Sequence, residues 1–131
     1  MIVVDASAVL SIVLQEDDAP IFEAALAAAG EGVITSVNYW EVLARALVKH
    51  DQAGIDLAAA LFARMRIGVE RVDADLAREA IEAFTRFRGR PGGRLNMGDT
   101  FAYALAQREG DGLLFKGNDF PRTDVKSALS P

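Results

Sequence analysis

Short apolar runs alternate along the chain with longer amphipathic segments. The runs lack the polar alternation of a half-exposed strand, as in Ile2-Val3-Val4, and are typical of strands buried on both faces of a parallel sheet. Strands are predicted at residues 2–4, 33–34, 69–72 and 113–115, with a last short extended segment near 125. Helices are predicted at about 8–14, 21–29, 36–49, 55–66, 74–87 and 97–109. This alternation favours an α/β fold around a mostly parallel sheet.

The chain has 131 residues, of which 51% are apolar and 25% are charged. This balance is that of an ordinary globular protein and argues against disordered, collagen-like and coiled-coil classes. Domains of about 100–200 residues are usual, and no linker, repeat or low-complexity tract interrupts the sequence. We therefore expect residues 1–131 to form a single domain.

Composition excludes several kinds of chemistry. The absence of cysteine removes disulfides, thiolate nucleophiles and zinc ribbons, and the single histidine, His50, has no histidine partner for acid–base work. A net charge of −5 disfavours binding of nucleic acid over the whole surface, although local basic patches remain open. No apolar run approaches the roughly 18 residues of a membrane helix. Asp5 interrupts an apolar start that lacks the basic residues of a signal peptide, so we expect a cytoplasmic protein.

Two aspartates follow apolar strand runs. Asp5 comes directly after the first run, and Asp119 comes after the fourth. Because ligand sites in open parallel sheets form at the carboxyl ends of strands, both side chains are expected in one crevice. Each also has a simpler interpretation, since Asp5 could cap the next helix and Asp119 could serve the Gly-Asn-Asp turn.

A third acid, Glu41, lies on the helix predicted from residue 36. It is the single charged member of a helical stripe at positions 37, 41, 44 and 48, and we expect the neighbouring Trp40 to pack inside. A charge on an apolar face is costly unless it is paired or bound to a metal ion. Pairing with Arg45 at the edge of the stripe is the alternative.

A fourth acid, Asp99, opens the helix near residue 97. Asn96 would allow a capping box there, yet the same position also suits a carboxylate that points into the crevice. Four acids in one crevice would repel one another, and a divalent cation removes that conflict. Oxygen ligands without cysteine or a histidine cluster select Mg²⁺ or Mn²⁺. Such an ion suits hydrolysis of phosphate esters.

Four segments resemble motifs of the PIN domain family, and more closely those of VapC-type ribonuclease toxins from bacterial toxin–antitoxin pairs. They are IVVDASAVL, TSVNYWEV, LNMGDTFAYALA and LLFKGNDFPRTDV. Each motif is short, but the four occur in family order and span essentially the whole chain. The resemblance implies a PIN-like three-layer α/β/α sandwich. It also implies cleavage of RNA that depends on one or two Mg²⁺ or Mn²⁺ ions.

The resemblance also implies roles for residues at the motif positions. Asn118 is neutral where family members often carry an acid, so the acidic role falls on the next residue. Ser7 stands at a hydroxyl position that would bind water on the metal, or would simply cap a helix. Thr123 and Asp124 match a Thr-Asp pair near the site whose role is open. The implied catalytic and metal-binding acids are Asp5, Glu41, Asp99 and Asp119.

An acidic site must still hold a polyanion, so nearby basic side chains are candidate RNA contacts. These candidates are Arg86, Arg88, Arg90, Arg94, Lys116 and Arg122. Four of them lie in a Gly- and Pro-containing loop region, and a solvated loop without RNA contacts is the alternative. Tyr39, Phe101 and Phe120 could stack on bases, but core packing is favoured for these aromatics.

The family resemblance further implies a homodimer and inhibition by a VapB-like antitoxin. An antitoxin arginine inserted among the carboxylates would pair with them and displace metal. The expected reaction is hydrolysis of an RNA phosphodiester bond, which leaves 5′-phosphate and 3′-hydroxyl ends.

Other functions fit parts of the pattern. A catalytically silent PIN-like module that only binds RNA or a partner would not need all four acids. A magnesium-dependent phosphatase of the haloacid-dehalogenase type would need a second acid at position 7, where Ser7 stands. A receiver module would use Lys116 but would leave Glu41 unexplained. The ribonuclease hypothesis accounts for more of the residues than these alternatives do.

Overall fold

The computed structural model describes residues 1–89 and 95–129 of the chain. Four parallel strands form its central sheet, in the order β3-β2-β1-β4. The strands are β1 (Ile2–Val4), β2 (Gly32–Thr35), β3 (Ile67–Glu70) and β4 (Leu113–Leu114). The helices are α1 (Ala6–Val13), α2 (Ala19–Ala29), α3 (Ser36–Arg64), α4 (Ala74–Phe87) and α5 (Met97–Glu109).

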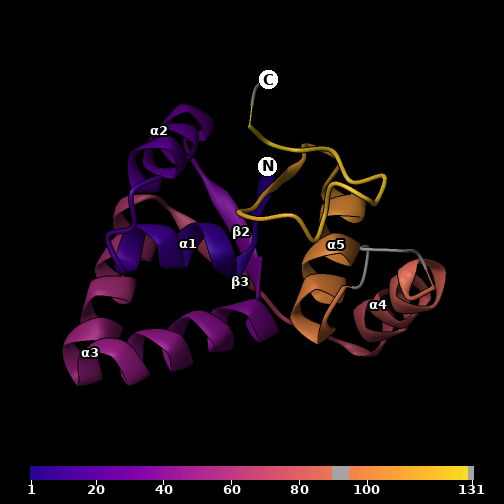
Figure 1. Cartoon of the computed structure of the whole chain (residues 1–131), viewed down its shortest axis with the longest axis horizontal. Helices are drawn as coiled ribbons and strands as arrows, with labels where there is room; N and C mark the ends of the chain where they lie inside the picture. The colour runs from indigo at the N-terminus through magenta and orange to yellow at the C-terminus, as the bar shows by residue number, and fades with distance from the viewer. Residues whose placement is uncertain (90–94, 130–131) are drawn as a thin grey trace.

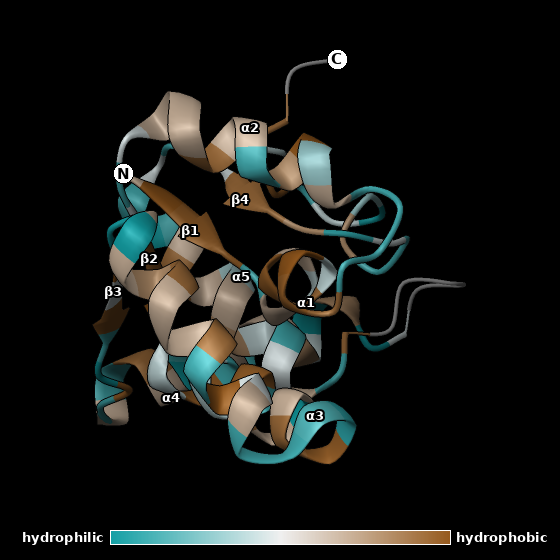
Figure 2. Ribbon diagram, turned by 90° about the vertical axis from the view of Figure 1, so that its left-hand side faces the viewer, coloured by the Kyte–Doolittle hydropathy of each residue, from teal (hydrophilic) through white to brown (hydrophobic). Residues whose placement is uncertain are grey.

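The inner strand β1 sets the register of the sheet. Val3 pairs with Val33 of β2 and with Leu113 of β4. Beyond β4, Ser127 forms an isolated parallel bridge with Leu113, so the expected extended segment near residue 125 lies slightly later in the chain. Val3 and Val4 have no exposed surface, as the apolar run predicted, and Figure 2 shows β1 as a hydrophobic strand.

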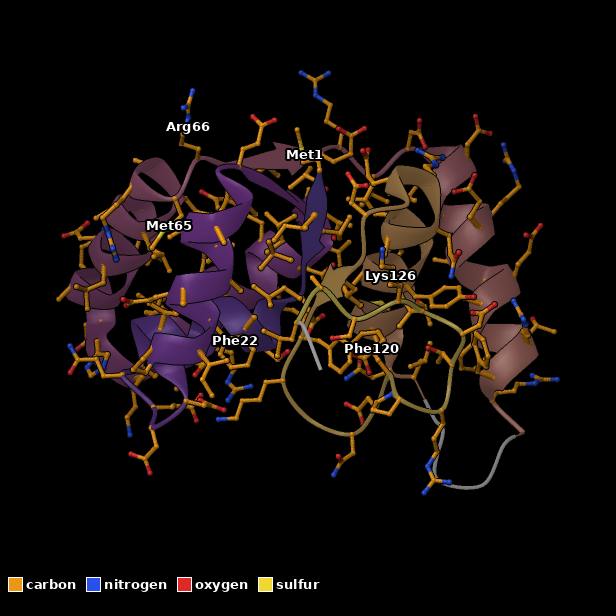
Figure 3. All side chains as sticks on the ribbon, turned by 90° about the horizontal axis from the view of Figure 1, so that it is seen from above. Met1, Phe22, Met65, Arg66, Phe120 and Lys126 are labelled. Atoms are coloured by element: carbon orange, nitrogen blue, oxygen red, sulfur yellow. The ribbon has the colours of Figure 1, made fainter. Side chains whose placement is uncertain are left out.

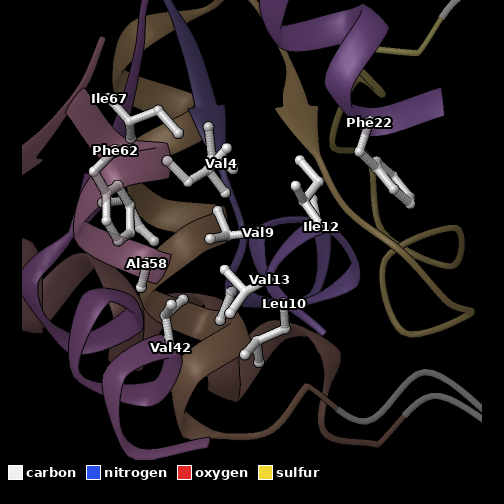
Figure 4. Packing of buried hydrophobic residues seen from close by; sticks show 14 of the residues in the cluster. Val4, Val9, Leu10, Ile12, Val13, Phe22, Val42, Ala58, Phe62 and Ile67 are labelled. Carbon is white, nitrogen blue, oxygen red and sulfur yellow. The ribbon is translucent and has the colours of Figure 1, made fainter. Parts of the chain in front are cut away.

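Helices cover both faces of the sheet, with α1, α2 and α3 on one side and α4 and α5 on the other (Figure 1). Each face has its own apolar cluster. Val4 and Phe22 belong to the first cluster (Figure 4), whereas Val3 and Phe120 belong to the second. Phe22 and Phe120 accordingly lie on opposite sides of β1 (Figure 3). Adjacent strand residues thus face opposite layers, as the pleat requires, and the three-layer α/β/α sandwich is confirmed.

Helix caps bring polar side chains to the carboxyl ends of the strands. Asp5 follows β1 and caps α1, and Thr35 ends β2 and caps α3. Asn96 and Asp99 form a reciprocal capping box at the start of α5. Since β1 and β2 are parallel neighbours, Asp5 and the first turn of α3 lie at the same edge of the sheet.

The boundaries of several elements differ from the sequence prediction. α1 begins at Ala6 rather than at residue 8, because Asp5 caps it at once. α2 begins at Ala19 because Pro20 suits the first turn of a helix. The two helices predicted at 36–49 and 55–66 form one helix with a kink at His50 and Asp51, where the backbone leaves the helical region. The third strand lies two residues earlier than predicted.

The prediction of which face of α3 is buried is wrong. Trp40 is 69% exposed and Val48 is 87% exposed, although both were expected on an inward face. Before the kink, the residues without exposed surface are instead Asn38, Val42 and Ala46. The helix begins where it was predicted, and the packing of Val42 and Ala46 in the apolar cluster shared with α1 determines the face that it buries. In the part of the chain that the structure describes, no helix combines the length and the apolar character needed to cross a membrane.

Gly54→Ala is expected to destabilise the protein, although alanine is the better helix former. The added Cβ would lie 2.1 Å from the carbonyl oxygen of Ala46, across the kink of α3. Overpacking of this kind costs about 1–3 kcal/mol, which urea unfolding followed by circular dichroism can measure. Gly68→Ala is the matched control because nothing lies within 4 Å of its added Cβ. Equal losses in the two variants would contradict the close approach within α3.

Candidate active site

Asp5 is buried at the carboxyl end of β1. Its Oδ2 accepts hydrogen bonds from the backbone N–H of Ser7 at 3.1 Å and from the Ser7 hydroxyl at 2.5 Å. Burial raises the pKa of Asp5, the bonds from Ser7 oppose this rise, and the charge of Asp119 adds to it. Asp5 is therefore a helix cap that also has an acidic neighbour from a distant segment of the chain.

Glu41 is partly buried in the second turn of α3. Its Oε1 accepts a hydrogen bond of 2.9 Å from Nδ2 of Asn38. Burial is the main cause of its raised pKa, the bond from Asn38 opposes the rise, and the charge of Asp5 adds to it. The charge of Arg45 lowers the pKa of Glu41, and this effect is the smallest of the four. Arg45 therefore has only a minor influence on the carboxylate, and pairing with it does not explain the position of Glu41.

Asp99 lies in the first turn of α5, where it forms a capping box with Asn96. The backbone N–H of Asn96 donates to its Oδ2 at 3.0 Å, and the Asp99 N–H donates to Oδ1 of Asn96 at 2.8 Å. Burial raises the pKa of Asp99 to about 7, and the charges of Asp5, Asp119 and Glu41 contribute to the rise. Asp99 therefore belongs both to the capping box and to the group of coupled acids.

The four acids thus come together from four separate segments: the end of β1, α3, the start of α5 and the loop after β4. Asp119 is exposed on that loop, and its charge acts on Asp5 and Asp99. Within residues 1–89 and 95–129, no three acidic or histidine side chains are gathered closely enough to hold a metal ion as they stand. The acids are electrostatically coupled neighbours rather than a closed cage of ligands.

The hydroxyls of Ser7 and Thr123 hold the loops beside the acids. The Ser7 Oγ, while donating to Asp5, accepts a hydrogen bond of 2.9 Å from the backbone N–H of Lys116. It therefore ties the segment after β4 to the start of α1. Thr123 Oγ1 donates to the carbonyl oxygen of Phe120 at 2.7 Å and accepts from the N–H of Val125 at 3.2 Å. This bonding folds the loop that follows Asp119.

Asp124 anchors the C-terminal loop to the pair of helices α4 and α5. It accepts a hydrogen bond from the hydroxyl of Tyr103 and forms an ion pair of 3.0 Å with Arg86. Burial and then the bond to Asp124 raise the pKa of Tyr103 to about 12. The Thr-Asp pair thus lies in a structural network, and Arg86 is bound within the protein.

The other candidate RNA contacts have different surroundings. Lys116 forms ion pairs with Asp18 at 3.1 Å and with Glu16 at 3.4 Å. The guanidinium of Arg88 lies 5.9 Å from the ring centre of Phe84. Arg122 is exposed near Asp119 in the chain. Arg90 and Arg94 lie outside the described residues.

The aromatic candidates pack as expected. Phe120 is fully buried, with its ring centre 5.0 Å from that of Phe115. Tyr39 makes an edge-to-face contact with Phe62 at 5.2 Å, and Phe101 packs against the cluster that contains Phe120. Core packing accounts for all three side chains.

Asn38 and Gly98, which the sequence pattern did not single out, both contact Glu41. Asn38 donates to Glu41 and, at 2.9 Å, to the carbonyl oxygen of Gly98. A Cβ at Gly98 would lie only 2.0 Å from Oε1 of Glu41. Glycine is unfavourable inside a helix, so its presence in the first turn of α5 was the signal in the sequence that another group, here the Glu41 carboxylate, lies close to the backbone.

The comparisons with known proteins agree with the motifs. The PIN domain family profile matches residues 2–126. Ribonuclease VapC42 of Mycobacterium tuberculosis is 40% identical over 132 residues, which covers 98% of this chain and 99% of that protein. Ribonuclease VapC of Mycolicibacterium smegmatis is 36% identical over 124 residues, which covers 94% of this chain and 96% of that protein.

Two solved structures share the fold at low sequence identity. The VapC20 toxin of M. tuberculosis, described as cleaving the sarcin–ricin loop, has a TM-score of 0.78 at 19% identity and covers 95% of this chain and 96% of its own. A toxin–antitoxin complex from Klebsiella pneumoniae has a TM-score of 0.69 at 17% identity, with 95% and 93% covered. The profile, the near full-length relatives and the common fold lead to one assignment: the chain belongs to the PIN domain family, among its VapC ribonucleases.

Proposed function

We propose that this ribonuclease cleaves RNA at the sheet edge where Asp5, Glu41, Asp99 and Asp119 converge, with Mg²⁺ or Mn²⁺ as its cofactor. The observation that carries the proposal is the coupling of the buried acids. Burial raises the pKa of Asp99 to about 7, and the charges of the other three acids add to the rise. Such a perturbed acid among like charges is typical of a functional site.

A divalent cation fits these residues. Their donors are carboxylate oxygens, which favour Mg²⁺ and Mn²⁺, and a cation would relieve the repulsion among them. Mg²⁺ usually keeps several water molecules, which agrees with acids that are close neighbours without forming a closed cage. When bound, the ion would supply a Lewis acid that stabilises the charge of the phosphate and of the leaving oxygen.

The chain's own side chains would orient this site. Ser7 fixes the carboxylate of Asp5, and the capping box fixes that of Asp99. Both acids lie at helix N-termini, where the backbone dipole favours a negative charge. The site is therefore organised by local hydrogen bonds before the substrate arrives. Attack by water on the scissile phosphate would leave 5′-phosphate and 3′-hydroxyl ends.

A role as a VapC toxin implies an antitoxin as partner and RNA as substrate. The family of VapC ribonucleases supports both, and one structural relative is a toxin–antitoxin complex. We further propose that the chain forms a homodimer and that the antitoxin is VapB-like and places an arginine among the acids.

Growth arrest on expression in bacteria, relieved by co-expression of the adjacent small gene, would support the toxin role. A complex in which the antitoxin does not approach the acids would contradict the arginine mechanism.

Asp5→Asn and Asp99→Asn are each expected to lower RNA cleavage by more than about 100-fold, because even outer-shell changes at metal sites cost about 10–100-fold. Labelled RNA incubated with Mg²⁺, with an EDTA control, measures the rate and the end groups. Asp56→Asn makes the same charge change on an exposed part of α3 and should keep full activity. Full activity in both site variants would refute the site assignment.

Asp99→Asn is also expected to change how stability depends on pH in the metal-free protein. The pKa of Asp99 is about 7 in the folded state against an ordinary 3.8. The folded state thus binds this proton more tightly than the unfolded state, so stability is lost as the pH rises from 3.8 through about 7. Above neutral pH the asparagine variant should therefore have the higher Tm.

Thermal melting in EDTA over this pH range measures the effect. The difference in Tm between the variant and the wild type should shrink as the pH falls, because protonated Asp99 is also neutral. Added Mg²⁺ should raise the Tm of the wild type more than that of Asp99→Asn. A Tm difference that does not change with pH would contradict the raised pKa of Asp99.

A further inference from the structure

A fully buried asparagine joins Glu41 to the first turn of α5. Nδ2 of Asn38 donates one hydrogen bond to Oε1 of Glu41 and one to the carbonyl oxygen of Gly98, both at 2.9 Å. Its Oδ1 accepts a hydrogen bond of 2.6 Å from the hydroxyl of Thr35. Both amide hydrogens are therefore used, and the side chain links the end of β2, α3 and α5.

Thr35 determines which way the amide of Asn38 faces. The Thr35 Oγ1 accepts the backbone N–H of Asn38 at 3.0 Å as the cap of α3. Its own hydrogen is then available for Oδ1 of Asn38. This arrangement turns the NH₂ group toward Glu41 and Gly98. An alanine or an aspartate at position 38 would lack both donors.

Gly98 limits the position of Glu41 from the other side. A Cβ at residue 98 would lie 2.0 Å from Oε1 and 3.0 Å from Oε2 of Glu41. The carboxylate thus occupies the space that any other residue at position 98 would fill. Because Asp99 is the next residue, the contact brings the acids of α3 and α5 together at the start of α5.

We propose that Asn38 is a positioning residue, whose amide holds the Glu41 carboxylate against Gly98 so that Glu41 and Asp99 face a common divalent cation. This inference rests on the proposed function of the same site. It assigns to Asn38 a role that acts through Glu41 and involves no contact with RNA. The role predicts weaker binding of the ion, rather than of the substrate, when the amide is removed.

Binding of Mn²⁺ to the RNA-free protein, followed by electron paramagnetic resonance, tests this role directly. Asn38→Ala is expected to raise the Kd for Mn²⁺ by about 10–100-fold, the usual effect of losing an outer-shell partner. Saturating Mn²⁺ should restore much of its cleavage rate, with an unchanged KM for RNA. Asp73→Ala is the control for lost stability, since it removes the cap of α4 at a distance from the acids. It should bind Mn²⁺ as the wild type does.

A double-mutant cycle separates positioning from a general structural effect. If Asn38 acts through Glu41, Asn38→Ala should cost no further Mn²⁺ affinity in a Glu41→Gln background, whereas additive losses would overturn the proposal. If Glu41→Gln alone leaves the affinity unchanged, the proposed ion site itself fails. If Glu41→Gln weakens binding and Asn38→Ala does not, only the role of Asn38 fails.

Should Asn38→Ala not fold, Gly98→Ala displaces Glu41 from the opposite side and leaves the asparagine in place. It is expected to weaken Mn²⁺ binding as well, and this loss should also vanish in the Glu41→Gln background. Wild-type affinity in Gly98→Ala would overturn the proposed contact between Glu41 and the first turn of α5.

Discussion

Burial of carboxylates at one edge of a parallel sheet is the constraint on which the rest of the structure depends. All four strands run in the same direction, so the segments that leave β1, β2 and β4 begin at the same edge. Those segments carry Asp5, Glu41 and Asp119, and α5 adds Asp99. Burial raises the pKa of Asp5, Glu41 and Asp99, and the charges of neighbouring acids add to the rise. The fold therefore maintains an unfavourable charge arrangement that a cation would relieve.

Helix caps allow the fold to keep these charges in place. Asp5 and Asp99 each accept backbone N–H groups at the start of a helix, so each would be a satisfactory cap without any catalytic role. The same bonds restrict the carboxylates to one orientation and partly oppose the rise in their pKa. The sequence leaves open whether each acid is a helix cap or a site residue. In the structure these two roles are compatible. One side chain can serve as both, because a helix N-terminus favours a carboxylate.

Features that depend on local pattern could be predicted from the sequence, and those that depend on long-range contacts could not. The strand runs and the caps follow from periodicity and turn chemistry, and the parallel topology places the segments that carry Asp5 and Glu41 at one edge of the sheet. The inward face of α3 was predicted wrongly, since Trp40 is exposed and Asn38 is buried. The pairing of Lys116 with Asp18 joins segments almost a hundred residues apart, and no local pattern indicates it. The roles of the individual site residues stay predictions.

The basic residues show how an acidic protein can still act on a polyanion. Arg86 and Lys116 form ion pairs with acids of the same chain, so their charge is partly used to hold loops beside the site. The net charge of −5 also argues against attraction of RNA over the whole surface. A cation among the acids would reduce the negative charge where the phosphate must bind. The placement of Glu41 by Asn38 would act on this step through the affinity for the ion.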